Sequence, residues 1–316
     1  MLPPPLPLPA MFALDAPPAS SSCAPVVEGA SALASDAQFW DLHEQVQRLG
    51  RGCFGSVLLV RSRESHRVAA VKVVATSQKE GDESPLLEPE LLRAARHRHV
   101  CRLLSVYQSA TTLFMLQDAE RTDLMGHAAT FADGVVGEDE ARGYLRGLLS
   151  AVRHIHSLRI VHRDIKATNV LLSAQGDVRL ADFGLAARLP EHGLLTSVCG
   201  THDYLAPEMV RCGHGECDGY GTSVDLWGVG LLLFSLLCGG NPFERDTDIA
   251  TLQAILAGTF AFPAHRPPPS DAAADLIGRL LVVDPQARLS AAEAVQLPWV
   301  RGGEDELVGE TAAAAA

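Results

Sequence analysis

The chain has 316 residues, of which 47% are apolar, and this is enough apolar surface for the buried core of one or two domains. A fibre, a mini-protein and a fully disordered chain are thereby excluded. Its 26 Lys and Arg against 38 Asp and Glu give a net charge of −12, which argues against sequence-independent binding to nucleic acid or another polyanion.

The N-terminus MLPPPLPLPA has neither the basic start nor the continuous apolar core of a signal peptide. No apolar stretch reaches the roughly 18 residues that span a bilayer, so we expect no membrane partner. The seven cysteines are odd in number and irregularly spaced, which is typical of thiols in a reducing compartment. We therefore expect the protein in the cytoplasm or the nucleus.

Both ends of the chain have a composition typical of disorder. Residues 1–40 are mainly Pro, Ala and Ser with little charge, so we expect a disordered arm there. Pro4 and Pro7 form a PxxP match to an SH3-type ligand, but such a match arises easily by chance in a Pro-rich segment. Residues 302–316 are acidic and then poly-Ala, which predicts a disordered tail.

Short β-rich runs dominate the next part of the chain, about 46–118. One charged helical candidate, Leu86–Arg96, interrupts them. This pattern predicts a small, mostly antiparallel lobe with one helix. The runs are Val46–Leu49, Ser56–Val60, Val68–Val74, Cys101–Tyr107 and Thr112–Leu116.

Helical periodicity takes over from Glu138, so residues of about 119–300 are expected to form a larger helical lobe. Ser223–Cys238 is apolar enough to be a buried central helix. The fold class is therefore α+β with two lobes. One face of the first long helix is expected to comprise Tyr144, Leu145, Leu148, Leu149, Val152 and Ile155.

A glycine-rich turn, Gly50-Arg-Gly52-Cys-Phe-Gly55, lies between two of the strand-like runs. Glycines let backbone N–H groups approach phosphate oxygens closely because no Cβ intervenes. A Rossmann turn has the same glycine spacing but needs a helix directly after it. Here a β-rich run follows and Lys72 lies in the next strand, which favours a different nucleotide site.

Three further motifs follow in order: His-Arg-Asp at 162–164 with Lys166 and Asn169, Asp-Phe-Gly at 182–184, and Ala-Pro-Glu at 206–208. With the glycine turn and Lys72, this set over residues 46–300 resembles the eukaryotic Ser/Thr protein kinases of the calcium/calmodulin-dependent group. Within that group the chain is similar to the phosphorylase kinase catalytic subunits. The segments that carry this similarity are Ser197–Thr201, Tyr204–Glu208, Tyr220-Gly, Val224–Trp227 and Leu281–Pro285.

The resemblance implies a two-lobed kinase fold that binds ATP and Mg²⁺ and transfers phosphate to Ser or Thr of protein substrates. By resemblance, Lys72 holds the α and β phosphates, Glu88 fixes Lys72, and Asp164 orients the attacking hydroxyl and accepts its proton. The resemblance also implies that Lys166 neutralises charge on the γ-phosphate and that Asn169 and Asp182 bind Mg²⁺. The other positions that it places at the nucleotide are Leu49, Gly50, Gly52, Gly55, Val57, Ala70 and Asp118.

Two departures from the family pattern leave questions open. Pro89 directly follows Glu88 and disfavours helical geometry for it, so Glu90 competes as the partner of Lys72. Thr168 and Ser235 stand where basophilic members carry Glu, and Asp123 is the one remaining acid for reading an upstream Arg. A strong preference for Arg three residues before the acceptor is therefore in doubt.

Two rival functions are weighed against the motifs. A non-catalytic kinase-like scaffold would have lost Lys72, Asp164 or Asp182, and the sequence retains all three. A small-molecule phosphotransferase would lack the Ala-Pro-Glu segment and Arg288, which in the family pairs with Glu208. The sequence contains both, which argues against this second rival.

The cysteines leave two alternatives. Cys212-x-His214-x-x-Cys217 has three possible zinc ligands, but its spacing is not that of a CxxC pair, and an ordinary loop is favoured. Cys53 and Cys199 lie near cationic or phosphate-binding features, where thiol oxidation competes with inert thiols as the interpretation.

Regulation is expected at the activation segment. Ser197, four residues before Thr201, stands where related kinases carry a residue phosphorylated by an upstream kinase, opposite Arg163. The alternative is an ordinary loop hydroxyl. No basic amphipathic helix follows residue 300, so calmodulin is not expected as a partner.

Overall fold

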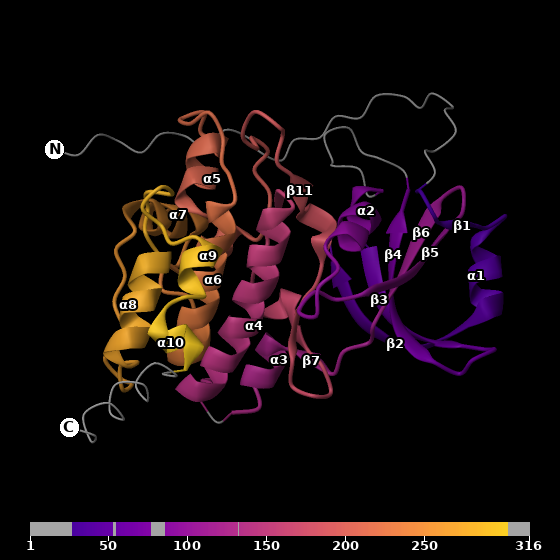
Figure 1. Ribbon diagram of the computed structural model, residues 1–316, viewed down its shortest axis with the longest axis horizontal. Helices are drawn as coiled ribbons and strands as arrows, with labels where there is room; N and C mark the ends of the chain where they lie inside the picture. Colours follow the sequence, from indigo (N-terminus) through magenta and orange to yellow (C-terminus); the bar gives the residue numbers. More distant parts are fainter. Residues whose placement is uncertain (1–26, 53–54, 77–85, 132, 303–316) are drawn as a thin grey trace, which may run out of the picture.

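The computed structural model describes residues 27–52, 55–76, 86–131 and 133–302, which form a β-sheet lobe and a helical lobe (Figure 1). The sheet lobe contains β1 (Ser31–Ala32), α1 (Asp36–Leu42), β2 (His43–Gly52), β3 (Gly55–Ser62), β4 (Val68–Ala75), α2 (Leu87–Ala94), β5 (Leu103–Gln108) and β6 (Thr112–Gln117). The helical lobe contains β7 (Thr122–Asp123), α3 (Leu124–Ala128), α4 (Glu138–Ser157), β8 (Ile160–Val161), η1 (Ala167–Asn169), β9 (Val170–Leu172), β10 (Val178–Leu180), η2 (Phe183–Leu185), β11 (Ala187–Arg188), η3 (His202–Tyr204), α5 (Pro207–Gly213), α6 (Ser223–Cys238), α7 (Asp248–Ala257), α8 (Asp271–Leu280), α9 (Ala291–Ala294) and α10 (Pro298–Arg301).

The sheet has the order β1-β5-β6-β4-β3-β2, and every neighbouring pair is antiparallel except β1 with β5. Four of the predicted strands fall within β2, β3, β4 and β6, and the fifth, Cys101–Tyr107, begins two residues before β5. The helical candidate forms α2, which is shorter than predicted at both ends. The prediction of a small, mostly antiparallel lobe with one interrupting helix is therefore confirmed.

The prediction of a disordered arm over residues 1–40 is wrong for residues 27–40. Phe39 of α1 is fully buried, with its ring stacked 4.1 Å from that of Phe114, and the Asp36 carboxylate accepts hydrogen bonds from Ser109 (2.5 Å) and Thr112 (2.8 Å). Aromatic burial and these bonds offset the entropy that composition alone suggested would keep the segment disordered. Residues 1–26, which include the PxxP match, and residues 303–316 lie outside the described ranges.

The helical lobe is built around α4 and α6. Helix α4 begins at Glu138, as predicted, and buries the six residues expected on its inner face. Helix α6 is buried on nearly every side and packs against both α4 and α8, which confirms it as the central helix. None of the helices in the described ranges is long and apolar enough to cross a bilayer.

Helix α2 belongs by packing to both lobes. Its Leu91 and Leu92 are buried in the apolar cluster that also contains the core of α4 and α6. In Figure 1 it lies between the sheet and the helical lobe. The sheet itself carries two small apolar clusters of its own, one with Phe39 and Phe114 and one with Val27 and Met115.

Candidate active site

The glycine turn joins β2 to β3. Gly50 pairs with Val57 and Gly52 with Gly55, while Cys53 and Phe54 lie outside the described residues. Gly55 has φ +147°, and a Cβ there would lie 2.0 Å from the carbonyl oxygen of Val73. Only glycine fits at this position, and so the turn approaches the lysine-bearing strand closely.

Lys72 lies on β4 and joins the two lobes. Its Nζ donates to both carboxylate oxygens of Glu88 at 2.8 and 2.7 Å and to Oδ1 of Asp182 at 2.6 Å. Burial alone would lower the pKa of Lys72, but the two carboxylates outweigh it and raise the pKa, so the ammonium stays charged. A buried cation is thus fixed between one residue of the sheet lobe and one of the helical lobe.

The structure pairs Lys72 with Glu88 and not with Glu90. Helix α2 begins at Leu87, so Glu88 and Pro89 lie in its first turn, where proline is tolerated because those N–H groups have no intrahelical acceptor. Glu90 has a side chain that is 65% exposed and lies 3.8 Å from Arg188.

The remaining residues assigned to the nucleotide lie on the sheet and at the link between the lobes. Val57 and Ala70 pair with Lys72 and Gln117 respectively, and Leu49 of β2 is half exposed. Asp118 follows β6, and its carboxylate accepts two hydrogen bonds from Arg102, at 3.1 and 3.0 Å.

Asp164 is buried among donors on the helical lobe. Its Oδ2 accepts from Asn169 Nδ2 at 2.9 Å and from Lys166 Nζ at 2.7 Å, and its Oδ1 accepts from the Thr201 hydroxyl at 2.7 Å and backbone N–H at 3.1 Å. The predicted catalytic carboxylate, lysine and amide are therefore brought together, and the activation segment is tied to them through Thr201.

A buried carboxylate on α6 fixes the backbone of the catalytic loop, residues 162–169. Asp225 accepts hydrogen bonds from the backbone N–H groups of His162 (2.9 Å) and Arg163 (2.8 Å) and from His156 Nε2 (2.8 Å). Arg163 has φ +67°, a left-handed conformation that costs a non-glycine residue about 1–2 kcal/mol. In the sequence Asp225 is only one residue of the family segment Val224–Trp227, and this role was not predicted.

Two oxygen atoms suit Mg²⁺ as ligands. Asn169 directs its Nδ2 at the carbonyl and carboxylate of Asp164, which leaves its amide oxygen without a donor among the described residues. The contacts of Asp182 within those ranges all use Oδ1, so Oδ2 is likewise left. Burial would raise the pKa of Asp182, but Lys72 outweighs it and lowers the pKa, so the carboxylate is ionised. Hard anionic and amide oxygens are the ligands that Mg²⁺ prefers.

The activation segment reaches Arg163 through Ser197. Arg163 donates to the Ser197 hydroxyl at 2.9 Å and to the Tyr220 hydroxyl at 3.2 Å, and Tyr220 in turn donates to the Ser197 carbonyl. Burial raises the pKa of Tyr220 to about 12, so it acts as a neutral donor. Tyr220 was quoted only as part of a family segment, and its contact with Ser197 was not predicted.

Glu208 and Arg288 form a buried bidentate ion pair, 80 residues apart in sequence, with contacts of 2.7 and 2.8 Å. Arg288 also donates to the Ser223 carbonyl at 2.7 Å, which joins α5, α6 and the segment before α9.

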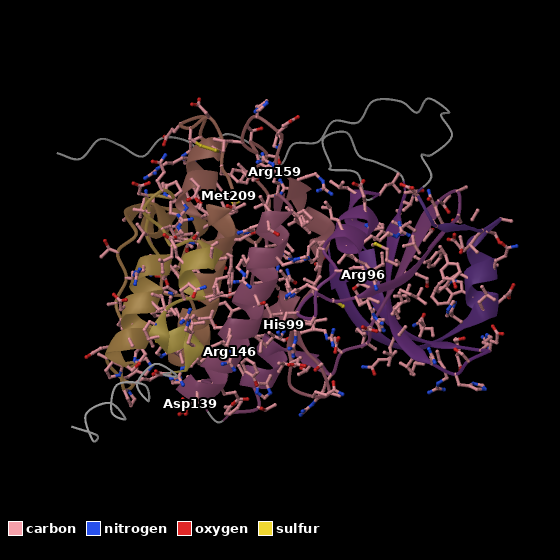
Figure 2. The ribbon with its side chains drawn as sticks, in the orientation of Figure 1. Arg96, His99, Asp139, Arg146, Arg159 and Met209 are labelled. Carbon is pink, nitrogen blue, oxygen red and sulfur yellow. A yellow bond between two sulfur atoms is a disulfide. The ribbon has the colours of Figure 1, made fainter. Side chains whose placement is uncertain are left out.

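The expectation that all cysteines are free thiols is wrong for Cys212 and Cys217, which form a disulfide at the end of α5. The favoured prediction of an ordinary loop missed this bond, and the two residues no longer support a reducing compartment. Figure 2 shows the yellow bond near Met209 of α5. No cluster of three or more His, Cys, Asp or Glu within the described ranges could hold a metal. Cys199 is a half-buried thiol, and Cys53 lies outside those ranges.

A small cavity of about 240 Å³ lies between α3, η3 and the end of α6. Two acidic residues, Asp203 and Glu244, line it together with Ser235. Neither residue stands at a position where basophilic relatives carry an acid, so the family pattern did not predict this pair. Asp123, the acid that it did consider, caps α3 by accepting from Gly126 N at 2.7 Å.

Comparison with known proteins places this geometry in a family context. The protein kinase domain model matches residues 43–300. The human phosphorylase b kinase gamma catalytic chain, liver/testis isoform, is 35% identical over 273 residues, which cover 83% of this chain and 67% of the relative. The serine/threonine-protein kinase H1 homolog of Danio rerio is 34% identical over 260 residues, covering 80% of this chain and 60% of the relative. The Aurora/IPL1-related protein kinase 2 of Caenorhabditis briggsae is 36% identical over 259 residues, covering 80% and 81%.

Proposed function

The chain belongs to the protein kinase family and is a serine/threonine protein kinase, and we propose that Asp164, Lys72 and Lys166 carry its phosphoryl transfer from ATP to protein hydroxyls. The observation that supports this most directly is the contact of Lys72 Nζ with Glu88 and Asp182 at 2.6–2.8 Å. Phosphoryl transfer needs charge fixed in position, and a lysine shared by both lobes fixes it.

Each residue has a role that follows from its contacts. Asp164 is held by three neighbours, so its carboxylate is oriented to receive the proton of a substrate hydroxyl. Lys166 donates a hydrogen bond to the same carboxylate and adds positive charge next to the transferred phosphoryl group. Mg²⁺, which protein kinases use with ATP, would offset phosphate charge, and Asn169 and Asp182 would hold it through their remaining oxygens.

A peptide array tests the activity and the acceptor together. Purified full-length protein with ATP and Mg²⁺ is expected to phosphorylate Ser and Thr peptides and to leave Tyr peptides unmodified. The matched control is Asp164→Asn on the same array. If the unmodified protein labelled no peptide, or if the variant labelled the peptides equally, the assignment would be contradicted.

We propose further that the cavity beside Ser235 favours a basic residue upstream of the acceptor. Asp203 and Glu244 supply the negative charge that Thr168 and Ser235 lack. On the same array, Glu244→Gln is expected to weaken the selection of Arg and Lys without changing the preference for Ser or Thr. An unchanged selection would assign the charge no part in substrate choice.

We propose that an upstream kinase phosphorylates Ser197. Arg163 already contacts the Ser197 hydroxyl, and a phosphate would add about −1.5 to −2 charge next to that guanidinium. Such charge-assisted bonds would order the activation segment. The test is peptide mapping of active enzyme, together with Ser197→Ala. Unmodified Ser197 and Thr196 with full activity of the variant would refute the switch.

A further inference from the structure

Residues 27–33, which we call the strap, lie outside the matched kinase domain but pack against it. The Val27 side chain is buried in a cluster with Val106 and Met115, and its N–H donates to the Gln108 side chain at 2.8 Å. The strand β1 within the strap pairs in parallel with β5. The strap is therefore fixed to the sheet at both of its ends, since Leu33 N–H also donates to the Gln108 carbonyl at 2.8 Å.

The strap also holds α2. Arg93 lies in the last turn of that helix. Its Nη1 donates a hydrogen bond to the Glu28 carbonyl, and its Nη2 donates one to the Gly29 carbonyl at 3.2 Å. Leu86, the residue directly before α2, packs against the same apolar cluster that contains Val27. Contacts at the two ends of α2 thus lead to one segment of chain.

Helix α2 is short enough to need stabilising contacts from other parts of the chain. It has eight residues, whereas isolated helices shorter than about 12–15 residues are marginal in water. Within the described part of the chain, no side chain caps its N-terminus. The same short helix must nevertheless keep Glu88 within 2.8 Å of Lys72.

We propose that the strap holds α2 in the position at which Glu88 reaches Lys72, with Arg93 as the positioning residue. A guanidinium that donates to two carbonyls is a charge-assisted, two-point contact, and its place at a helix C-terminus also complements the helix dipole. The proposal rests on the role of the Lys72–Glu88 pair given above.

Hydrogen exchange tests the proposal independently of activity. A truncation that removes residues 1–33 takes away the strap and keeps Ser35 and α1, while a matched truncation removes only residues 1–26. In the longer truncation, amides 91–95 of α2 are expected to exchange roughly tenfold faster than in the shorter one. Amides 145–152 of α4 serve as the internal reference and are expected to be unchanged.

Point variants in the full-length chain avoid the risk that truncation prevents folding. Arg93→Ala is expected to raise exchange in α2 and to lower kcat/KM for ATP by roughly tenfold. Arg93→Lys is expected to lie between Arg93→Ala and the unmodified protein, because one ammonium cannot reproduce the planar fork. The matched control is Arg96→Ala, an exposed arginine two residues beyond the helix end.

Restoration in trans is the most specific test. A synthetic peptide of residues 27–35, added to the longer truncation, is expected to restore slow exchange in α2 in a saturable way, and the same peptide with Val27→Asp is not. Equal α2 exchange in the two truncations, or in Arg93→Ala and Arg96→Ala, would overturn the proposal. If the full-length chain transferred no phosphate, the proposed function would fail, while the exchange data would still decide the role of the strap.

Discussion

Two helices hold the two halves of the active site, and they do so by different means. Helix α6 has 16 residues, is buried on nearly every side, and presents the Asp225 carboxylate to backbone N–H groups of the catalytic loop. Helix α2 has eight residues, and it keeps Glu88 in place through an ion pair with Lys72 and contacts at the protein surface.

This difference separates what folding fixes from what can be changed afterwards. The catalytic loop cannot leave Asp225 without exposing a buried carboxylate and the core around α6, so its position is coupled to global stability. Helix α2 is held by fewer buried residues, and its movement breaks the polar contacts of Glu88 and Arg93 and disturbs the packing of Leu91 and Leu92. Substitutions near α6 should therefore alter stability, and those near α2 should alter activity.

The largest effect is expected where a residue belongs to the firmly held half but has a chemical role. Asp164→Asn should reduce kcat by about 10²–10⁴-fold, since a carboxamide cannot accept the proton of the attacking hydroxyl. The amide nitrogen that replaces one carboxylate oxygen faces hydrogen-bond donors, so the melting temperature should fall, but the variant should remain folded. Single-turnover phosphorylation and thermal unfolding measure the two quantities, and a normal rate would remove Asp164 from catalysis.

The next effect concerns stability alone. Arg288→Ala leaves Glu208 as a buried charge without its partner, and this should lower the unfolding free energy by about 3–5 kcal/mol. Denaturant unfolding measures the loss. The double variant Glu208→Leu with Arg288→Met removes both charges and should recover part of it, and a double variant less stable than Arg288→Ala would contradict this account.

On the α2 side the balance should reverse. Glu88→Gln removes the charge that Lys72 contacts and should lower kcat/KM for ATP by about 10–100-fold, with a smaller loss of stability than Arg288→Ala causes. Glu90→Gln is the matched control, because its exposed side chain should change stability by less than about 0.5 kcal/mol and leave the rate unaffected. The opposite order of rates would move the ion pair to Glu90.

The smallest effect is a dependence on pH. Burial would raise the pKa of Asp225, but the hydrogen bonds from His156 and the loop N–H group and the nearby positive charge outweigh it and lower the pKa. A carboxyl whose pKa is lower when folded stabilises the protein fully above its unfolded pKa of about 3.9, and this stabilisation is lost as the pH falls through the folded pKa.

The unfolding free energy should therefore fall more steeply from about pH 5 to pH 3 in the unmodified protein than in Asp225→Asn. Urea unfolding at several pH values measures the two slopes. Parallel slopes would show that this carboxyl does not couple folding to protons.

The sequence predicted the motif residues and both lobes because these depend on short, local patterns. Glu88 and Glu90 remained alternatives because both lie in the first turn of α2, and only the three-dimensional contact with Lys72 distinguishes them. The segment before residue 40 was missed because its partners are remote: Val27 bonds to Gln108, 81 residues away. No local periodicity reports such a contact.

The disulfide was missed for a related reason, since two cysteines five residues apart are compatible with a loop, a metal site or a bond. Asp203 and Glu244 are 41 positions apart in the sequence and line one cavity only in the folded chain. Spatial proximity of remote side chains is thus what the sequence patterns did not contain.

The disulfide has a consequence for chain entropy. Cys217 is bonded to Cys212, and three residues later Tyr220 exchanges two backbone hydrogen bonds with Leu195 of the activation segment, at 2.8 and 3.0 Å. The cost of closing a loop grows with the number of freely rotating residues that it contains. The disulfide already closes the loop of residues 212–217. The chain around Tyr220 therefore has fewer conformations to lose when Leu195 binds to it.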